Sequence, residues 1–298
     1  MGAGFRRLLL PVAASALLAG CGNGVLNPEG PIGAAERMIL FNSLAIMLAI
    51  VIPTIIAVIG FAWWFRAGNE KARYRPEWTF SGRIELVVWS IPLLVVLFLA
   101  GVIWVGSHQL DPYRPIASRT KALEVQVVSL DWKWLFIYPE QGIASVNELV
   151  VPAGVPVHFS LTSASVMNSF FVPQLGSMIY TMNGMVTQLH LQADRPGTYW
   201  GQSAHFSGDG FSDMHFMTRS VLPNAFATWA TQAKGQGPML DAAAYATLAR
   251  QSVVEQPFRY GAVQPGLFML IATQKIAPAA GPQVGRGGPK TVSPRSKS

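Results

Sequence analysis

Few residues of this chain could bind a metal or carry a redox reaction. The sequence of 298 residues holds one cysteine, Cys21, and five histidines. One cysteine cannot form an internal disulfide bond or a site of paired thiolates. Met214 lies between His205 and His215, but no cysteine lies near them, and neighbouring positions on a strand point to opposite faces. We therefore predict no functional metal site at the histidines of the second half of the chain: His158, His190, His205 and His215.

Cys21 stands where a lipid anchor would be attached. Two arginines precede an apolar run over residues 8–18, and small residues come directly before the cysteine. These features predict a bacterial lipoprotein signal peptide over residues 1–20. Cleavage before Cys21 would then leave a new N-terminal cysteine that carries palmitate. The alternative is an ordinary signal peptide followed by an incidental cysteine.

Two longer apolar runs predict transmembrane helices. Residues 38–65 carry no charged side chain, and residues 84–105 carry only Glu85. A helix needs roughly 20 apolar residues to cross a bilayer. The composition agrees, since only 12% of the residues are charged, against about 25% in soluble proteins. We expect helices over residues 38–66 and 84–106; the alternative is a pair of buried helices in a soluble protein.

The charged residues indicate how the chain crosses the membrane. The segment over 67–83 contains four basic side chains against two acidic ones, whereas Arg37 is the only basic residue in the segment over 21–37. Positively charged loops stay in the cytoplasm. The loop over 67–83 is therefore expected inside, and residues 21–37 and everything after residue 106 outside. This distribution of the net charge of +7 fits membrane topology better than nucleic-acid binding.

Residues 120–235 have the pattern of an all-β domain. Apolar and polar side chains alternate over residues 123–128, 157–162 and 188–192, and turn residues separate these runs. Alternation with a period of two marks strands with one buried face, so we expect a β-sandwich or barrel. An arm over residues 236–275 follows, with a helix expected over 239–250 and several aromatic residues. The tail over 276–298 is basic and poor in large apolar residues, and we expect it to be disordered.

Four stretches together resemble subunit II of the haem–copper oxidases. They are residues 85–92 at the start of the second apolar run, Asp131–Trp134, residues 165–176, and residues 197–203 with the loop that follows to Met214. The resemblance covers about residues 15–275. It implies a two-helix transmembrane hairpin, then a periplasmic cupredoxin-like β-sandwich and a C-terminal helical arm.

In the cytochrome c oxidases of this family, the domain holds a two-copper centre. Its ligands are two histidines, two bridging cysteines, a methionine and a backbone carbonyl. Of these positions the sequence keeps only Met214; the others hold Asn168, Ser203, His205, Ser207 and Phe211. Serine hydroxyls do not ionise near neutral pH, so they cannot replace the soft bridging thiolates that copper requires. The resemblance therefore implies a subunit with no metal, cofactor or catalytic residue of its own.

This loss resembles the branch of cytochrome bo-type ubiquinol oxidases. The resemblance implies a proton-pumping complex of the bacterial inner membrane that oxidises ubiquinol and reduces oxygen to water. Haems and copper would lie in subunit I, the main partner beside further small membrane subunits, and cytochrome c would not be a donor. Two alternatives stay open: a cytochrome c oxidase subunit II, and a scaffold lipoprotein that reuses the sandwich without an oxidase.

Glu85 and two tryptophans match functional positions of the family. The glutamate that matches Glu85 lies at the mouth of a proton-uptake path, so Glu85 is a candidate for that role. The alternative is an interfacial carboxylate paired with Arg83 or Lys71. Trp132 and Trp134 match an aromatic stretch near the electron-entry surface of copper-bearing relatives. Without copper, we expect these two side chains to serve packing.

Overall fold

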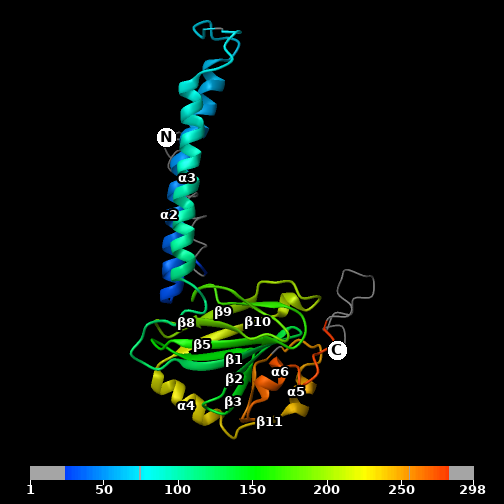
Figure 1. The fold of residues 1–298 in the computed structure, drawn as a ribbon. Helices are drawn as coiled ribbons and strands as arrows, with labels where there is room; N and C mark the ends of the chain where they lie inside the picture. The colour runs from blue at the N-terminus through cyan, green and yellow to red at the C-terminus, as the bar shows by residue number, and fades with distance from the viewer. Residues whose placement is uncertain (1–23, 74, 255, 282–298) are drawn as a thin grey trace, which may run out of the picture. The chain divides into compact units, whose positions relative to one another are not determined.

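The computed structural model describes residues 24–73, 75–254 and 256–281, and the chain divides into two compact units. Residues 37–111 form one unit, and the segments on either side of them form the other (Figure 1). The predicted signal peptide, Cys21 and the tail from residue 282 lie outside the described residues.

The first unit is a helical hairpin. Helix α2 covers Pro31–Trp64 and helix α3 covers Gly82–Gln109. The most apolar stretch of each helix has a mean hydropathy of 2.8 and no buried residue, as expected of side chains that face lipid. The two helices pack closely at Gly106, where an added Cβ would lie 2.9 Å from Ile39 Cδ1. Helix α2 begins before the apolar run at Pro31, a residue well suited to a first helical turn.

The second unit is a β-sandwich. One sheet has the strand order β12-β3-β2-β1-β5-β8, and the other has the order β4-β10-β9-β6-β7. Strand β1 pairs with β2 in the antiparallel sense and with β5 in the parallel sense. The strands are β1 Leu123–Leu130, β2 Lys133–Tyr138, β3 Ile143–Val146, β4 Glu148–Pro152, β5 Val157–Ser163, β6 Asn168–Phe171, β7 Ile179–Thr181, β8 Thr187–Leu191, β9 Gly197–Ser203, β10 His215–Val221 and β12 Phe258–Tyr260.

Aromatic rings from both sheets fill the space between them. Trp134 of β2 meets Phe170 of β6 at 5.5 Å and Phe216 of β10 at 5.6 Å between ring centroids. Edge-to-face contacts of this kind stabilise a core beyond the area that they bury. Gly201 of β9 leaves room for the cluster, because an added Cβ would lie 2.2 Å from the Phe216 ring. Helix α4, Pro223–Ala233, adds Trp229, whose ring lies 5.2 Å from that of Tyr138.

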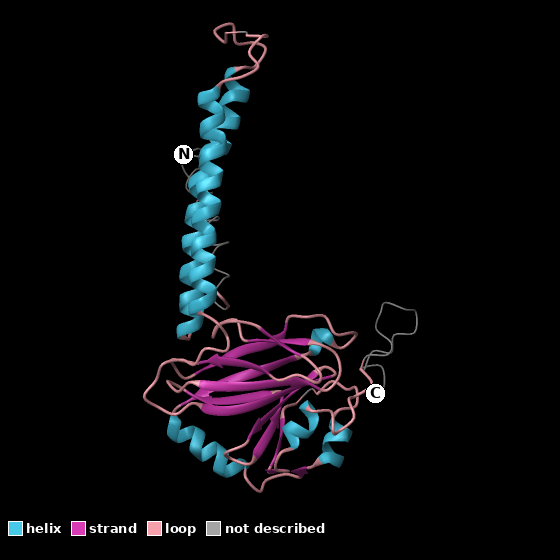
Figure 2. Ribbon diagram, viewed as in Figure 1, coloured by secondary structure: helices cyan, strands magenta, loops and turns pink. Residues whose placement is uncertain are grey.

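The C-terminal arm covers the outer face of the sheet that contains β1, β2 and β3. It consists of β11 Met239–Leu240, α5 Ala242–Leu248, β13 Ala262–Val263 and α6 Leu267–Ala272 (Figure 2). Its side chains form a second apolar cluster with Leu130 and Leu135, which point away from the sandwich core. Strand β2 is therefore buried on both faces.

Two expectations for the arm and tail differ from the structure. The helix expected from residue 239 begins only at Ala242, because Met239–Leu240 pairs with β13 and the carboxylate of Asp241 caps the helix by accepting from Ala244 N at 2.8 Å. The start of the tail, residues 276–281, lies against the domain instead of leaving it. Ala279 N donates to Ala164 O at 2.8 Å, and Ile276 packs on the second cluster.

The segment before α2 and the first turns of this helix also belong to the sandwich unit. Glu29 N donates to Gln174 O at 2.7 Å, and Gly33 N donates to Leu175 O at 3.1 Å. At Gly30 an added Cβ would lie 2.1 Å from Gln192 O, so only glycine fits this contact. Residues on both sides of the hairpin thus contact each other, and the two helices must leave and re-enter the same compartment.

Candidate functional site

The copper-ligand positions of the resemblance lie together at one end of the second sheet. Asn168 begins β6, Ser203 ends β9, and the loop over 204–214 leads into β10. The Ser203 hydroxyl lies 3.3 Å from Asn168 Oδ1 and 3.2 Å from His205 O, and can donate its proton to either acceptor. The cupredoxin end of the fold is therefore preserved, but a hydroxyl and an amide satisfy each other within it.

In the second half of this loop, the residues at the copper-ligand positions also contact other groups of the protein. The Ser207 hydroxyl lies 3.7 Å from Met214 Sδ, and Met214 is buried in the sandwich core. The indole of Trp132 donates to Ser207 O at 3.2 Å and lies against Gly210, where an added Cβ would approach the ring to 2.2 Å. Phe211, in the short helical turn before β10, offers no ligand atom. The side chains at these positions do not fit a two-copper centre, which needs bridging thiolates as ligands.

The histidines do not converge on a common point. The ring of His215 stacks on Trp200 at 4.4 Å, and His205 meets Tyr180 edge-on at 5.9 Å. His158 and His190 stack on each other at 4.6 Å on the other sheet. Among the described residues, no group of three or more histidine, cysteine, aspartate or glutamate side chains is placed to hold a metal.

A buried pair of charged residues lies beside this loop and was not expected from the sequence. The turn between β1 and β2 places Trp132 in the left-handed region, with φ of 68°. Asp131 and Lys133 flank it and are 2% and 0% exposed. Lys133 Nζ donates to Arg250 O at 2.7 Å and to Ser252 Oγ at 2.6 Å. The lysine therefore connects the sandwich to the segment that follows α5.

Burial shifts the pKa values of this pair in opposite directions. Burial raises the pKa of Asp131 above its usual range, although hydrogen bonds from Ser165 and Gln251 and the charge of Lys133 oppose the rise. Burial lowers the pKa of Lys133 to about 8, against a smaller opposing effect from the Asp131 charge. Both shifts follow the rule that a low-dielectric environment disfavours the charged form.

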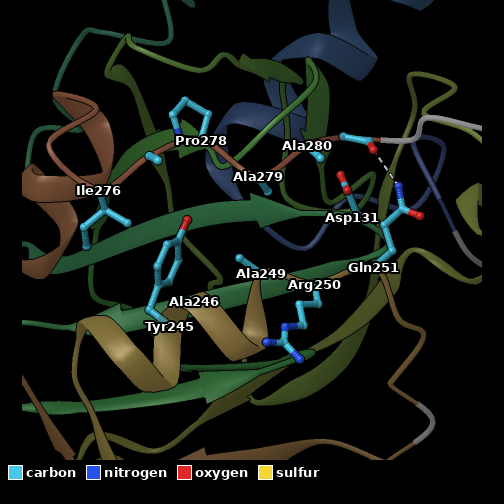
Figure 3. A pocket seen from close by; sticks show the side chains of 12 residues that line it. Asp131, Tyr245, Ala246, Ala249, Arg250, Gln251, Ile276, Pro278, Ala279 and Ala280 are labelled. Atoms are coloured by element: carbon cyan, nitrogen blue, oxygen red, sulfur yellow. Dashed lines mark hydrogen bonds between the residues drawn. The ribbon is translucent and has the colours of Figure 1, made fainter.

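Asp131 borders a cavity of about 520 Å³ between the sandwich and the arm (Figure 3). Tyr245 and Arg250 line it from α5 and the residues just after this helix, and residues 276–281 line the opposite side. The Gln251 side chain donates to Gly281 O at 2.6 Å, and both residues line the cavity (Figure 3). The nearby contacts hold the arm and the start of the tail on the sandwich. Aspartate and lysine flanking a tryptophan are the only sequence signal for this site.

Glu85 lies in the first turn of α3, in the hairpin unit. Its carboxylate accepts a hydrogen bond from Trp89 Nε1 at 3.0 Å, one helical turn further on. In the described part of the chain, Glu85 forms no ion pair with Arg83 or Lys71. The side chain is exposed on the surface of the hairpin.

Comparisons with known proteins identify the family. Residues 123–221 match the model of the cytochrome c oxidase subunit II periplasmic domain, and residues 234–278 match the COX aromatic rich motif. Ubiquinol oxidase subunit 2 of Acetobacter aceti is 49% identical over 266 residues, which are 88% of this chain and 86% of that protein. The chain belongs to the ubiquinol oxidase subunit II family. Cytochrome bo(3) ubiquinol oxidase subunit 2 of Pseudomonas aeruginosa is 46% identical over 89% of this chain and 80% of that protein.

Membership of the ubiquinol oxidase subunit II family confirms the predicted resemblance and the predicted fold class. The alternative of a cytochrome c oxidase subunit II is less supported, because the curated relatives above carry the ubiquinol oxidase name. The chain is a membrane protein with two spanning helices and a periplasmic domain, and it is a subunit of an oxidoreductase complex.

Proposed function

We propose that this chain is the non-redox structural subunit of a proton-pumping ubiquinol oxidase. The complex oxidises ubiquinol and reduces oxygen to water, and its haems and copper lie in subunit I. The observation that carries this proposal is the hydrogen bonding of Ser203 with Asn168 and His205 where copper-bearing relatives need thiolates. Because quinol is dissolved in the bilayer, electrons can reach subunit I without passing through the periplasmic domain.

Purification of the complex through a tag on this chain tests the proposal. We expect haem to co-purify in gentle detergent, with oxygen uptake driven by ubiquinol and not by reduced cytochrome c. The periplasmic domain contributes no near-infrared copper absorbance. Recovery of this chain without haem from intact membranes would contradict the proposal, as would a paired-copper signal that maps to Ser203 and Ser207.

We also propose that the chain lies in the bacterial inner membrane, with its main domain on the periplasmic side. Cys21 carries the lipid anchor on the periplasmic side, and the basic loop over 67–83 lies in the cytoplasm; the excess of basic residues in this loop supports that orientation. A Cys21→Ser variant grown with labelled palmitate should lose the label that the wild-type chain acquires. Equal labelling of both chains would refute the anchor.

Glu85 is proposed to sit at the cytoplasmic entry of a proton path into subunit I. Support comes from its position in the first turn of α3 and from the hydrogen bond that Trp89 donates to its carboxylate. A carboxylate at a membrane boundary is costly to keep and is often functional. We expect Glu85→Gln to slow quinol-driven oxygen uptake while the haem content stays constant.

The matched control is Trp89→Phe, which removes the hydrogen bond but keeps the carboxylate. It should retain most of the oxygen uptake. The Glu85→Asp variant keeps a carboxylate at this position. Higher oxygen uptake in Glu85→Asp than in Glu85→Gln would support proton transfer by this side chain. Unchanged turnover and pumping in Glu85→Gln would show that the carboxylate has no part in proton uptake.

A further inference from the structure

The turn of the helical hairpin contains a pocket with basic side chains on its walls. It has a volume of about 990 Å³ and lies between the end of α2, the loop and the start of α3. Among the described residues, four basic side chains line it and no acidic side chain does so. They are Arg66, Lys71, Arg73 and Arg75.

The end of α2 shapes this pocket. Arg66 Nη1 donates to Trp63 O at 2.8 Å, and its guanidinium lies 4.8 Å from the centre of the Trp63 ring. Asn69 Nδ2 donates to Trp64 O at 2.5 Å, and Asn69 Oδ1 accepts from Lys71 N at 3.2 Å. These bonds satisfy carbonyls that a helix end leaves without partners. They also turn the chain back, so that the next basic residues line the pocket beside the helix end.

Within the described part of the chain, no acidic side chain pairs with the charges that line the pocket. In the described residues, Lys71, Arg73 and Arg75 form no ion pair. Glu70 and Glu77 belong to the same loop but do not line the cavity. Like charges held around one cavity repel each other, and a bound anion removes this cost.

Part of the pocket wall is aromatic. Trp64, Phe65 and Trp78 line it, and each is about half exposed. Tryptophan side chains gather where a membrane meets water. A ligand that fits must carry a negative charge for the basic side chains and an apolar part for the aromatic walls. A free inorganic anion satisfies only the first requirement.

We propose that this pocket binds the phosphodiester headgroup of an anionic phospholipid from the cytoplasmic leaflet. The basic side chains contact the phosphate, and the aromatic side chains contact the glycerol and the first part of the acyl chains. Basic pockets on the cytoplasmic side of membrane helices are suited to such headgroups. The bound lipid neutralises the turn of the hairpin where it meets the membrane surface.

The test uses the purified, delipidated oxidase complex and native mass spectrometry. Phosphatidylglycerol, phosphatidylethanolamine and inorganic phosphate are titrated separately and in competition. The variant K71Q/R73Q/R75Q removes three pocket charges, and Arg83→Gln is the matched control, since Arg83 lies in the first turn of α3 and does not line the pocket. Ala72→Trp fills the pocket and keeps every charge.

We expect the wild-type complex to bind one more phosphatidylglycerol than the triple variant. The affinity of that site should fall about a hundredfold in the triple variant, at about fivefold per basic residue near a membrane surface. Ala72→Trp should lose the same lipid, and Arg83→Gln should keep it. If the triple variant fails to assemble with haem, the binding of phosphatidylglycerol by Ala72→Trp alone tests the proposal.

Three results would overturn the proposal. One is equal binding of phosphatidylglycerol by the wild type and Ala72→Trp. Another is equal loss in the triple variant and Arg83→Gln, which would show that only the overall loop charge matters. The third is displacement of the lipid by inorganic phosphate at equal concentration, which would show that the pocket selects a free anion.

Discussion

Replacement of Lys133 by methionine separates what the buried charge costs from what its hydrogen bonds contribute. Methionine has a similar length but carries no charge and no donor. The variant leaves Arg250 O, Ser252 O and Ser252 Oγ without the donor that now reaches them at 2.7, 3.2 and 2.6 Å. Removal of one partner from a buried charged network costs about 3–5 kcal/mol. We expect the lower end of this range at pH 7, because the burial cost of the charge disappears as well.

The dependence of this loss on pH follows from the lowered pKa of Lys133. The folded value of about 8 lies below the ordinary value of 10.5. Between these two values the unfolded chain binds more protons than the folded chain, so the stability of the wild-type chain rises with pH. At pH 7 the burial cost is fully present, and it is relieved as the pH rises through 8. From pH 7 to 9.5 the gain is about 2 kcal/mol.

The assay is unfolding of the full chain in detergent by guanidinium, followed by tryptophan fluorescence at pH 7 and 9.5. The stability difference between the wild type and Lys133→Met should widen by about 2 kcal/mol over this range. Lys121→Met is the control: Lys121 is exposed, and its hydrogen bond with Glu140 raises its pKa. Because a lysine with a raised pKa stays protonated in both the folded and the unfolded chain from pH 7 to 9.5, the stability difference between the wild type and Lys121→Met should stay constant over this range. A constant difference for Lys133→Met would refute the buried-charge reasoning.

Three further predictions concern the sandwich. Glu148→Gln weakens the ion pairs that the carboxylate forms with Arg219 and Arg259 at 2.7 and 2.8 Å. Burial acts to raise the pKa of Glu148, but the two arginines outweigh it and hold the pKa below its usual value. The variant should therefore lose about 1 kcal/mol of unfolding free energy at pH 7. This loss should shrink as the pH falls through the folded pKa of Glu148, and thermal unfolding at pH 7 and 3 measures it. Gly201→Ala should cost about 1–3 kcal/mol because its Cβ would collide with the Phe216 ring, and an unchanged unfolding midpoint would contradict that packing. Incubation of the purified chain with Cu(II) should leave no stoichiometric copper after desalting, measured by metal analysis and near-infrared absorbance.

The strands with one buried face and one partly solvent-exposed face could be predicted from the sequence. Alternation over residues 123–128 corresponds to β1, in which Leu123, Val125 and Val127 are buried and Glu124 and Gln126 are half-buried. Strand β2 gives no such signal, because the arm covers its outer face and all its residues are buried. That cover comes from residues more than 100 positions later in the chain, which local periodicity cannot reveal.

The copper-ligand positions could be located by resemblance, but the charged pair beside them could not. Lysine is almost never fully buried, so its type predicts exposure. Lys133 is buried only because carbonyls from residues 250 and 252 reach its Nζ, and Arg250 is 117 positions away in sequence. Gln251, between these two residues, donates to Gly281 O, so the same segment also contacts the start of the tail.

The docking of the first turns of α2, and of the segment before them, has a consequence for biogenesis. Glu36 accepts a hydrogen bond from Ser177, 141 residues later in the chain. During translation this segment emerges long before its binding surface exists, and both helices must be inserted before the two can meet. Docking is therefore a late step that follows membrane insertion. A chain in which the second helix failed to return to the periplasm would leave Gly30 and Gly33 without the backbone that they contact.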